Sequence, residues 1–240
     1  MEIEKIWNES SWTNQARDII TNLTKFPKDS KVILILRHSQ RNEPKEFSVN
    51  ADLSLTPQGR KIAYLFGNRL PKSRSIRVFH SDVERCKNTA NEIFNGFKAI
   101  GGNAILEGSF KPLSHIGIAV KSFFQENEKY KILELFYRWV AGIYSPTLWT
   151  PLIKYTQKAG LLMLEKIENA PEKILDIHVT HDLHLMALRL GWFGLHPDGR
   201  WVDYLGGFAF SLLEDQIKLF EYGEFKPVEY PYWWKNSKTT

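Results

Sequence analysis

The sequence has few of the features that mark a secreted, membrane-bound or nucleic-acid-binding protein. Cys86 is its one cysteine, so no intramolecular disulfide can form, which is typical of a reducing compartment. The first seven residues include acidic side chains and no apolar core, so we expect no signal peptide. No apolar run approaches the ~20 residues of a membrane helix. We therefore expect a cytoplasmic protein that does not act at a membrane.

Neither sign of charge dominates the composition. The chain of 240 residues has 32 basic and 27 acidic side chains and a net charge of +5. It has no dense lysine and arginine stripe of the kind that binds nucleic acid. An apolar fraction of 43% is that of a globular protein, and the length suits one domain, predicted over residues 1–240. This balance favours a small anionic ligand over nucleic acid.

The clearest element present is the apolar run Val32 to Leu36, which is followed by Arg37-His38-Ser39-Gln40-Arg41. A continuous apolar run of this length predicts a strand buried on both faces of a parallel or mixed sheet. Ligands of such sheets bind at the carboxyl ends of the strands. The cationic cluster at this end therefore predicts an anionic ligand.

Helical periodicity and turn signals organise the rest of the chain. Thr56 is expected to cap a helix with Pro57 in its first turn, and Ser81 and Glu84 have the spacing of a capping box. Residues 42–52 are expected to form a loop over the sheet's edge, and the aromatic tail 230–234 to pack on the body. We predict helices near 11–24, 57–70, 84–97, 152–167 and 183–190, and strands at 76–80, 103–107, 174–180, 207–213 and 216–222.

The interval between Glu107 and Ile174 is longer than one crossover helix requires, and it is helical in pattern and rich in aromatic residues. We interpret it as a helical cap over about 110–150, followed by the crossover helix. The predicted fold is an α/β, three-layer αβα sandwich around a mixed, mostly parallel sheet, with this helical cap insertion.

Polar residues follow three of the predicted strands, and together they resemble a known family. The residues are Arg37, His38 and Arg41 after the first strand, Arg85 after the second, and His181 and Asp182 after the strand 174–180. Residues 37–41 match the Arg-His-Gly-x-Arg signature of the histidine phosphatase superfamily, which includes phosphoglycerate mutases and histidine acid phosphatases. Residues 55–59 match its Leu-Thr-x-x-Gly, and SDVERCKNTA at 81–90 looks like its Ser-x-x-x-Arg-Cys-x-x-Thr-Ala element.

Thr180-His181-Asp182-Leu183 is similar to the His-Asp element of the acid phosphatase branch, so we expect the chain to be closer to that branch. Two departures stand out. Ser39 replaces the signature glycine, which affects the backbone after the nucleophile but removes no reacting group. The chain also lacks the disulfides that are common in the acid phosphatase branch.

The resemblance implies a metal-independent phosphomonoesterase that uses no cofactor. Arg37, Arg41 and Arg85 would bind phosphoryl oxygens with planar, permanently charged donors. A neutral His38 would attack phosphorus and form a phosphohistidine, and His181 would stabilise the transferring group. Expected ligands are a small-molecule phosphomonoester and, in its place, inorganic phosphate or vanadate.

The leaving oxygen needs a proton donor, for which we prefer Asp182, because like charge from a bound phosphate raises the pKa of a nearby carboxyl. Glu107, at the end of the third strand, is the alternative donor, as in the mutase branch. Two other readings stay open: a phosphoglycerate-mutase-type phosphotransferase that uses Glu107, and a catalytically silent phosphate-binding module.

Two further readings are less favoured. HVTHDLH at 178–184 suggests a metallohydrolase, but its spacing fits no standard metal motif, so His178 is interpreted as a hydrogen-bonded strand histidine and His184 as a helix-surface one. Cys86 as a thiol nucleophile would want an arginine six positions later, where Glu92 stands, and a buried small side chain is the better interpretation.

Overall fold

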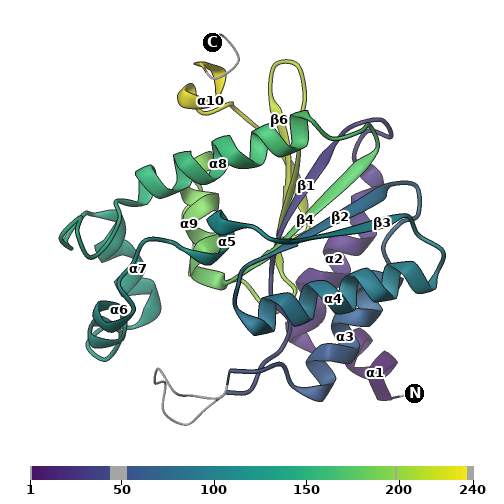
Figure 1. Cartoon of the computed structure of the whole chain (residues 1–240), viewed down its shortest axis with the longest axis horizontal. Coiled ribbons are helices and arrows are strands. Elements are labelled where there is room, and N and C mark those ends of the chain that lie inside the picture. Colours follow the sequence, from purple (N-terminus) through teal and green to yellow (C-terminus); the bar gives the residue numbers. More distant parts are fainter. Residues whose placement is uncertain (1, 44–52, 198, 237–240) are drawn as a thin grey trace.

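The computed structural model describes residues 2–43, 53–197 and 199–236, which fold around a seven-stranded sheet (Figure 1). The strands lie in the order β3-β2-β4-β1-β5-β6-β7, with β1 at the centre. Strands β1 to β4 are parallel to one another, and β5 to β7 join as antiparallel neighbours. The strands are β1 (Val32–Arg37), β2 (Ser75–His80), β3 (Ala104–Ser109), β4 (Ile174–Thr180), β5 (Gly207–Leu212), β6 (Ile217–Glu221) and β7 (Glu224–Val228).

Every predicted strand is present, with ends within two residues of those expected. Strand β7 was not predicted, because Pro227 and the charged side chains of Glu224 and Lys226 leave its five residues without a strand pattern. Its place at the edge of the sheet explains how a proline is tolerated there.

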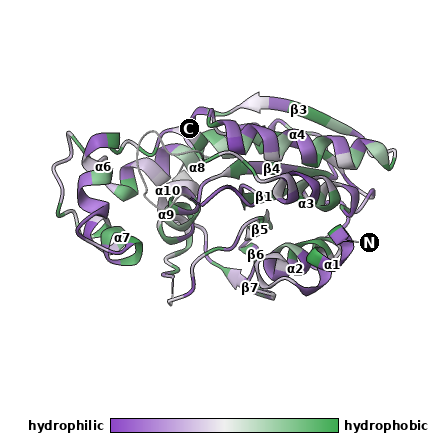
Figure 2. Cartoon of the chain, turned by 90° about the horizontal axis from the view of Figure 1, so that it is seen from below, coloured by the Kyte–Doolittle hydropathy of each residue, from purple (hydrophilic) through white to green (hydrophobic). Residues whose placement is uncertain are grey.

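Helices cover both faces of this sheet, so the fold is the predicted three-layer α/β sandwich. Figure 2 shows α1 to α4 on one side of the sheet and α8 to α10 on the other, with α6 and α7 beyond α8 and α9. The longer helices are α1 (Glu2–Glu9), α2 (Asn14–Asn22), α3 (Pro57–Asn68), α4 (Glu84–Ala99), α8 (Leu152–Glu168) and α9 (Asp182–Phe193). Helix α1 was not predicted, and short 3-10 turns at Ser11–Thr13 and Leu23–Lys25 interrupt the helix expected over 11–24.

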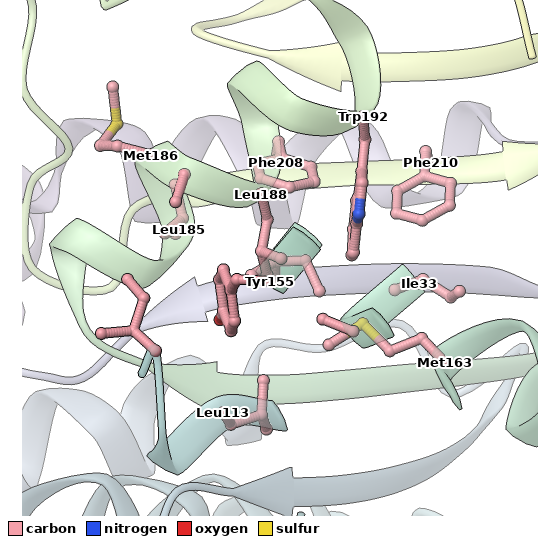
Figure 3. Close-up of a cluster of buried hydrophobic side chains, with 14 of the residues drawn as sticks. Ile33, Leu113, Tyr155, Met163, Leu185, Met186, Leu188, Trp192, Phe208 and Phe210 are labelled. Carbon is pink, nitrogen blue, oxygen red and sulfur yellow. The ribbon is translucent and has the colours of Figure 1, made fainter. Parts of the chain in front are cut away.

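Strand β1 is buried on both faces because its side chains enter two separate cores. Ile33 and Ile35 join the core beneath α8 and α9, part of which is drawn in Figure 3. Val32, Leu34 and Leu36 point the other way, into the core beneath α1 to α4. Successive side chains of a strand point to opposite faces of the sheet. When both faces are covered, every position is apolar and the sequence shows an unbroken apolar run.

Helices α3 and α4 pack closely, and their backbones approach each other where α3 ends. A Cβ atom added at Gly67 would lie 2.1 Å from the backbone oxygen of Ile93, so the two backbones approach through this glycine. Thr56 caps α3 as predicted, since its hydroxyl accepts a hydrogen bond of 2.9 Å from the Gly59 amide. The predicted capping box of α4 is wrong: the residue before α4 is Val83, and the Ser81 hydroxyl instead contacts His181.

Between β3 and α8 the chain forms α5 (Lys111–Ser114), α6 (Val120–Asn127) and α7 (Ile132–Val140). The assignment of this segment as a cap, and of residues 1–240 as one domain, stays a prediction. The loop expected at 42–52 lies outside the described residues from 44 onward. In the aromatic tail, which ends in α10 (Tyr232–Asn236), Trp234 is buried against Trp192 and Phe210 as expected. Within the described ranges, no helix has the length and apolar character needed to cross a bilayer.

Candidate active site

The carboxyl end of β1 brings Arg37 and His38 to the middle of the sheet edge. The His38 amide donates to the backbone oxygen of Thr180 at 2.9 Å, which holds it against the end of β4. The Arg37 amide donates to the backbone oxygen of Gly206 at 2.9 Å, just before β5. Two neighbouring strands therefore fix the backbone of these residues.

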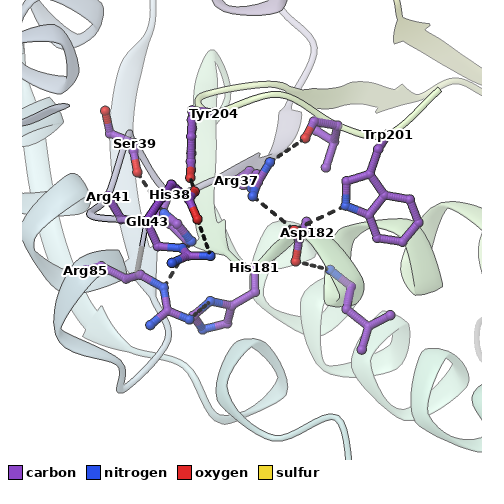
Figure 4. Close-up of polar contacts among 12 residues, drawn as sticks. Arg37, His38, Ser39, Arg41, Glu43, Arg85, His181, Asp182, Trp201 and Tyr204 are labelled. Carbon is purple, nitrogen blue, oxygen red and sulfur yellow. Dashed lines mark hydrogen bonds and ion pairs between the residues drawn. The ribbon is translucent and has the colours of Figure 1, made fainter. Parts of the chain in front are cut away.

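The hydrogen bonds of His38 define which nitrogen carries its proton (Figure 4). Its Nδ1 lies 2.8 Å from the backbone oxygen of Ser39, which can only accept, so Nδ1 carries the hydrogen. Its Nε2 accepts from Arg85 Nε at 3.0 Å. Burial, and then the charge of Arg85, lower the pKa of His38 to about 3. The imidazole is therefore neutral at pH 7, with its lone pair on Nε2.

Arg85, in the first turn of α4 as predicted, joins His38 to His181. Its Nη2 donates to His181 Nδ1 at 3.0 Å, while its Nε contacts His38. The two imidazole rings lie 5.6 Å apart, centroid to centroid. His181 Nε2 lies 3.1 Å from the Ser81 hydroxyl, and burial followed by nearby positive and imidazole groups lowers its pKa well below 6.5. One guanidinium thus faces both neutral histidines.

Asp182, the first residue of α9, forms the second polar centre. Its Oδ2 lies 3.0 Å from Arg37 Nη2 and accepts from Trp201 Nε1 at 3.1 Å, and its Oδ1 accepts from the Leu183 amide at 2.8 Å (Figure 4). Burial acts to raise the pKa of this carboxyl, but Arg37 and the Trp201 indole outweigh burial, so the pKa lies below its ordinary value. Asp182 is therefore ionised at neutral pH.

The loop after His38 is held by buried contacts that accommodate Ser39. Ser39 has no left-handed φ, so a glycine is not needed at this position. Its hydroxyl donates to the Gly59 oxygen at 2.7 Å, and its amide donates to Thr89 Oγ1 at 3.0 Å. A Cβ atom at Gly59 would lie 2.1 Å from the Gln40 backbone oxygen. The start of α3 therefore presses directly on the signature loop, and the glycine there is needed for that approach.

Arg41 lies in the same neighbourhood: burial, and after it the charge of Arg41, acts to lower the pKa of Arg85. Its Nη2 lies 3.2 Å from Glu43 Oε2, and its Nη1 donates to the Asn42 oxygen at 2.9 Å. The Tyr204 hydroxyl also donates to Glu43, and the Tyr204 ring lies 4.3 Å from the Arg37 guanidinium carbon. Glu43 and Tyr204 thus link the two arginines that flank His38.

Glu107, the alternative proton donor, lies on β3 with an exposed side chain. The charges it acts on are those of Arg77 and Asp176, which form an ion pair of 2.6 Å on the face covered by α8. Arg77 and Asp176 are paired within the sheet, several residues before the strand ends that carry His38 and His181. The role of Glu107 as a proton donor stays a prediction.

Two other histidines lie in environments unlike those expected. His178 is buried and stacks on Phe79 at 4.7 Å, and neither ring nitrogen has a hydrogen-bond partner among the residues that the structure describes. It is therefore not a hydrogen-bonded histidine, and burial lowers its pKa to about 3. His184 is buried rather than on the helix surface, 5.3 Å from the His181 ring, because α9 is covered on every side. Cys86 is buried, as expected, with its sulfur 3.6 Å from His181 Nε2.

Sequence reasoning missed the contribution of the segment 201–206, defined here as the β5 approach segment. Trp201 donates to Asp182, the Val202 oxygen accepts from Arg37 Nη1 at 2.7 Å, and Tyr204 covers Arg37. The segment has no helical or strand periodicity, so the only signal in the sequence was two aromatic residues in a loop. Thr89 was within the matched element SDVERCKNTA but had been given no role.

Comparison with known proteins supports the superfamily and revises the branch. The family model described as "Histidine phosphatase superfamily (branch 1)" matches residues 33–110, which run from β1 to the residue after β3. This stretch therefore carries the pattern of branch 1. The predicted closeness to the acid phosphatase branch, drawn from four residues around His181, is not supported. No curated protein matches the chain.

Solved structures share this fold at low sequence identity. A mycobacterial glucosyl-3-phosphoglycerate phosphatase in complex with VO3 has a TM-score of 0.55 and 17% identity, covering 83% of this chain and 99% of that one. A mutant phosphoserine phosphatase from Entamoeba histolytica in complex with phosphoserine has a TM-score of 0.51 and 14% identity, covering 85% and 98%. An open reading frame of Mycobacterium tuberculosis has a TM-score of 0.51 and 18% identity, covering 83% and 96%. These likenesses show the fold.

Proposed function

We propose that this chain, whose residues 33–110 match the histidine phosphatase superfamily, branch 1, hydrolyses a small-molecule phosphomonoester through a phosphohistidine on His38. The observation that carries the proposal is the contact of Arg85 with both imidazoles, at 3.0 Å from each. Such a guanidinium can bind phosphoryl oxygens while a lone pair lies next to phosphorus.

In the first step, Arg85 turns its donors from His38 Nε2 to the oxygens of the bound phosphoryl group. The freed lone pair of Nε2 then forms a bond to phosphorus, and the bond from phosphorus to the leaving oxygen breaks. The electron pair passes to that oxygen, which takes the proton of Asp182. His181 faces the equatorial oxygens of the phosphoryl group and can donate a hydrogen bond to one of them. Negative charge is spread over these oxygens in the transition state.

In the second step, a water molecule attacks the phosphorus of the phosphohistidine. Its proton passes to the Asp182 carboxylate, and the N–P bond breaks, which returns the electron pair to Nε2. The hydrogen bond from Nδ1 to the Ser39 oxygen keeps the same tautomer through both steps. The products are an alcohol and inorganic phosphate, so the cycle needs no metal or cofactor.

Asp182 must gain a proton before it can donate one, and substrate binding supplies the cause. In the structure Arg37 is 3.0 Å from its carboxylate. A phosphate dianion that draws Arg37 away removes this stabilising charge and places a like charge near Asp182, and both changes raise its pKa. Asp182 is favoured over Glu107 because the charge of Asp182 acts on His38, whereas the charge of Glu107 acts on Arg77 and Asp176.

The named ligands of two relatives agree with this chemistry. Vanadate is bound by the mycobacterial phosphatase and phosphoserine by the Entamoeba phosphatase. Vanadate is an analogue of a phosphoryl group, and phosphoserine is a phosphomonoester. These ligands support a phosphate ester as the class of substrate for this chain.

The test is release of inorganic phosphate from a panel of phosphomonoesters by the wild type and by His38→Ala. We expect release that vanadate inhibits, no release by the variant, and an acid-labile phosphoenzyme trapped from the wild type alone. Glu2→Ala, at an exposed position of α1, serves as the matched control. A binding module would bind phosphate without turnover. A mutase would exchange phosphate between isomeric sugar acids faster than it releases it, and either result would reject the hydrolase.

A further inference from the structure

We infer that Trp201 is the positioning residue of the proton donor: its indole N–H holds Asp182 Oδ2 and helps to set the pH range in which that carboxyl donates. This inference rests on the proposed role of Asp182. It concerns a residue of the β5 approach segment for which the sequence had suggested no function. Trp201 acts through Asp182 and is not itself expected to touch the reacting atoms.

The first observation is that one carboxylate oxygen receives two donors of different kinds. Asp182 Oδ2 lies 3.0 Å from Arg37 Nη2 and 3.1 Å from Trp201 Nε1. The guanidinium is the group that a phosphate would attract, whereas the indole is neutral and lacks the positive charge that would draw it to phosphate. After Arg37 turns to the substrate, Trp201 remains on Oδ2. The oxygen therefore keeps its direction at the stage when it must carry or deliver the proton.

The second observation is that the indole ring is itself fixed from the opposite side. The Phe136 ring of α7 meets the Trp201 ring edge to face, with centroids 6.1 Å apart and planes at 83°. Phe136 is fully buried, so this contact belongs to the core and not to a mobile surface. Because Val202, the next residue, accepts a hydrogen bond from Arg37, the same short segment holds both members of the ion pair.

Other charged and titratable groups also face Asp182, and the test variant, Trp201→Phe, must leave them unchanged. They come from the end of β1, from α4 and from α9. These groups are Arg37, His38, Arg85, Cys86 and His184. Replacing the indole by a phenyl ring removes one donor from the carboxylate and keeps all of these groups in place.

The experiment compares Trp201→Phe with the wild type in the pH dependence of kcat, which reports the enzyme–substrate complex. A general acid must be protonated, so kcat falls as the pH rises through its pKa. Loss of a donor to the charged form raises that pKa, so we expect the falling limb to move upward by about one pH unit. The shift should appear with an alkyl ester such as glycerol 3-phosphate. It should be absent with p-nitrophenyl phosphate, whose leaving group needs no proton.

Two further variants make the result specific. Trp139→Phe removes an indole N–H of α7 that donates to the Thr150 oxygen at 2.8 Å, just before α8, and it should leave both pH profiles unchanged. Trp201→Gln keeps an N–H donor at a similar reach and should restore the wild-type limb. If Trp201→Phe does not fold, as judged by thermal unfolding, Trp201→Gln decides. A falling limb of kcat at the same pH as in the wild type supports the inference, and a falling limb displaced by one pH unit contradicts it.

The inference is overturned if Trp201→Phe has the wild-type profile with the alkyl ester, or if the limb moves equally with the aryl ester. Failure of the proposed function looks different. In that case the wild type itself releases no phosphate, or His38→Ala releases as much as the wild type does.

Discussion

The candidate site has two sides that are built differently. On the first side, the ends of β1 and β2 bring arginines to the site. On the second side, the residues after β4 bring a carboxyl, and the β5 approach segment brings two aromatic rings. On the first side, side chains are fixed by contacts between backbones and buried hydroxyls, such as Ser39 to Thr89. On the second side, Asp182 is fixed by side chains from elements distant in sequence, Arg37 and Trp201. Under the proposed function, phosphoryl binding would rest on this backbone scaffold, and proton delivery on an ion pair that substrate would open.

The sharpest test of this division is Arg85→Ala on the first side. It removes the donor shared by His38 and His181, so we expect kcat/KM to fall by about 10³-fold with alkyl and aryl esters alike, because both require phosphoryl stabilisation. Arg69→Ala, which removes an arginine paired with Glu4 at the far end of α3, is the control and should retain activity. If kcat/KM fell with alkyl esters only, Arg85 would act like a group on the second side, and the proposed difference between the two sides would be wrong.

Asp182→Asn tests the second side and should be selective. We expect about a 10²-fold loss of kcat with alkyl esters and less than about a tenfold loss with p-nitrophenyl phosphate, whose leaving group is stable as an anion. Asp203→Asn is the matched control, because its carboxylate lies in the same segment but accepts from Gln15 at 3.2 Å. An equal loss with both esters would show that Asp182 is not the acid.

Gly59→Ala tests how rigid the first side is. The new Cβ would lie 2.1 Å from the Gln40 oxygen, so the signature loop or α3 must move. We expect the free energy of unfolding to fall by about 2 kcal/mol, with a loss of activity that stability alone does not explain. Gln58→Ala, at the exposed preceding position, should change neither quantity, as followed by urea unfolding and phosphate release. Unchanged activity in a stable Gly59→Ala would mean that the loop adapts easily.

His178 lies on the same strand that leads to His181 but has no place in the chemistry, and it contributes a pH dependence of stability. Its pKa is 6.5 in an unfolded chain and about 3 in the folded protein. Between these values the unfolded state binds the extra proton, so stability is full above pH 6.5 and declines as the pH falls toward 3. The slope from this group approaches about 1.4 kcal/mol per pH unit.

We therefore expect His178→Phe to unfold less readily in acid than the wild type, by comparison of urea midpoints at pH 7 and pH 4. Stacking on Phe79 is kept by the phenyl ring. His115→Phe changes an exposed histidine, with 78% of its side chain accessible, and should show the wild-type decline. If the urea midpoint of His178→Phe declined as much as that of the wild type, the loss of stability in acid would come from the other buried histidines.

The contrast between the two sides also explains what could be predicted from the sequence. The apolar run of β1, the cap at Thr56 and the position of Arg85 are local patterns, and each was predicted where the structure has it. The capping box at Ser81 failed because a tertiary partner, His181, lies beside its hydroxyl. His184 was misplaced because α9 is buried all round and its periodicity gives no outer face.

The missing residues of the site share one physical reason. Trp201 and Tyr204 belong to a loop whose path depends on where β5 pairs with β1, and loop geometry leaves no period in a sequence. The tautomer of His38 depends on the Ser39 carbonyl, which no side-chain pattern reports. The ionised state of Asp182 follows from Arg37 and Trp201, so it could be known only after the chain was folded.

The central place of β1 has a consequence for how the protein is made. Both of its neighbours, β4 and β5, are translated long after it. At a ribosomal rate of ~5–20 residues per second, the strand that leads to His38 waits on the order of ten seconds for Gly206 and β5 to emerge. Until then the apolar strand β1 lacks one or both of its neighbours in the sheet, and the sheet edge that holds His38 is incomplete.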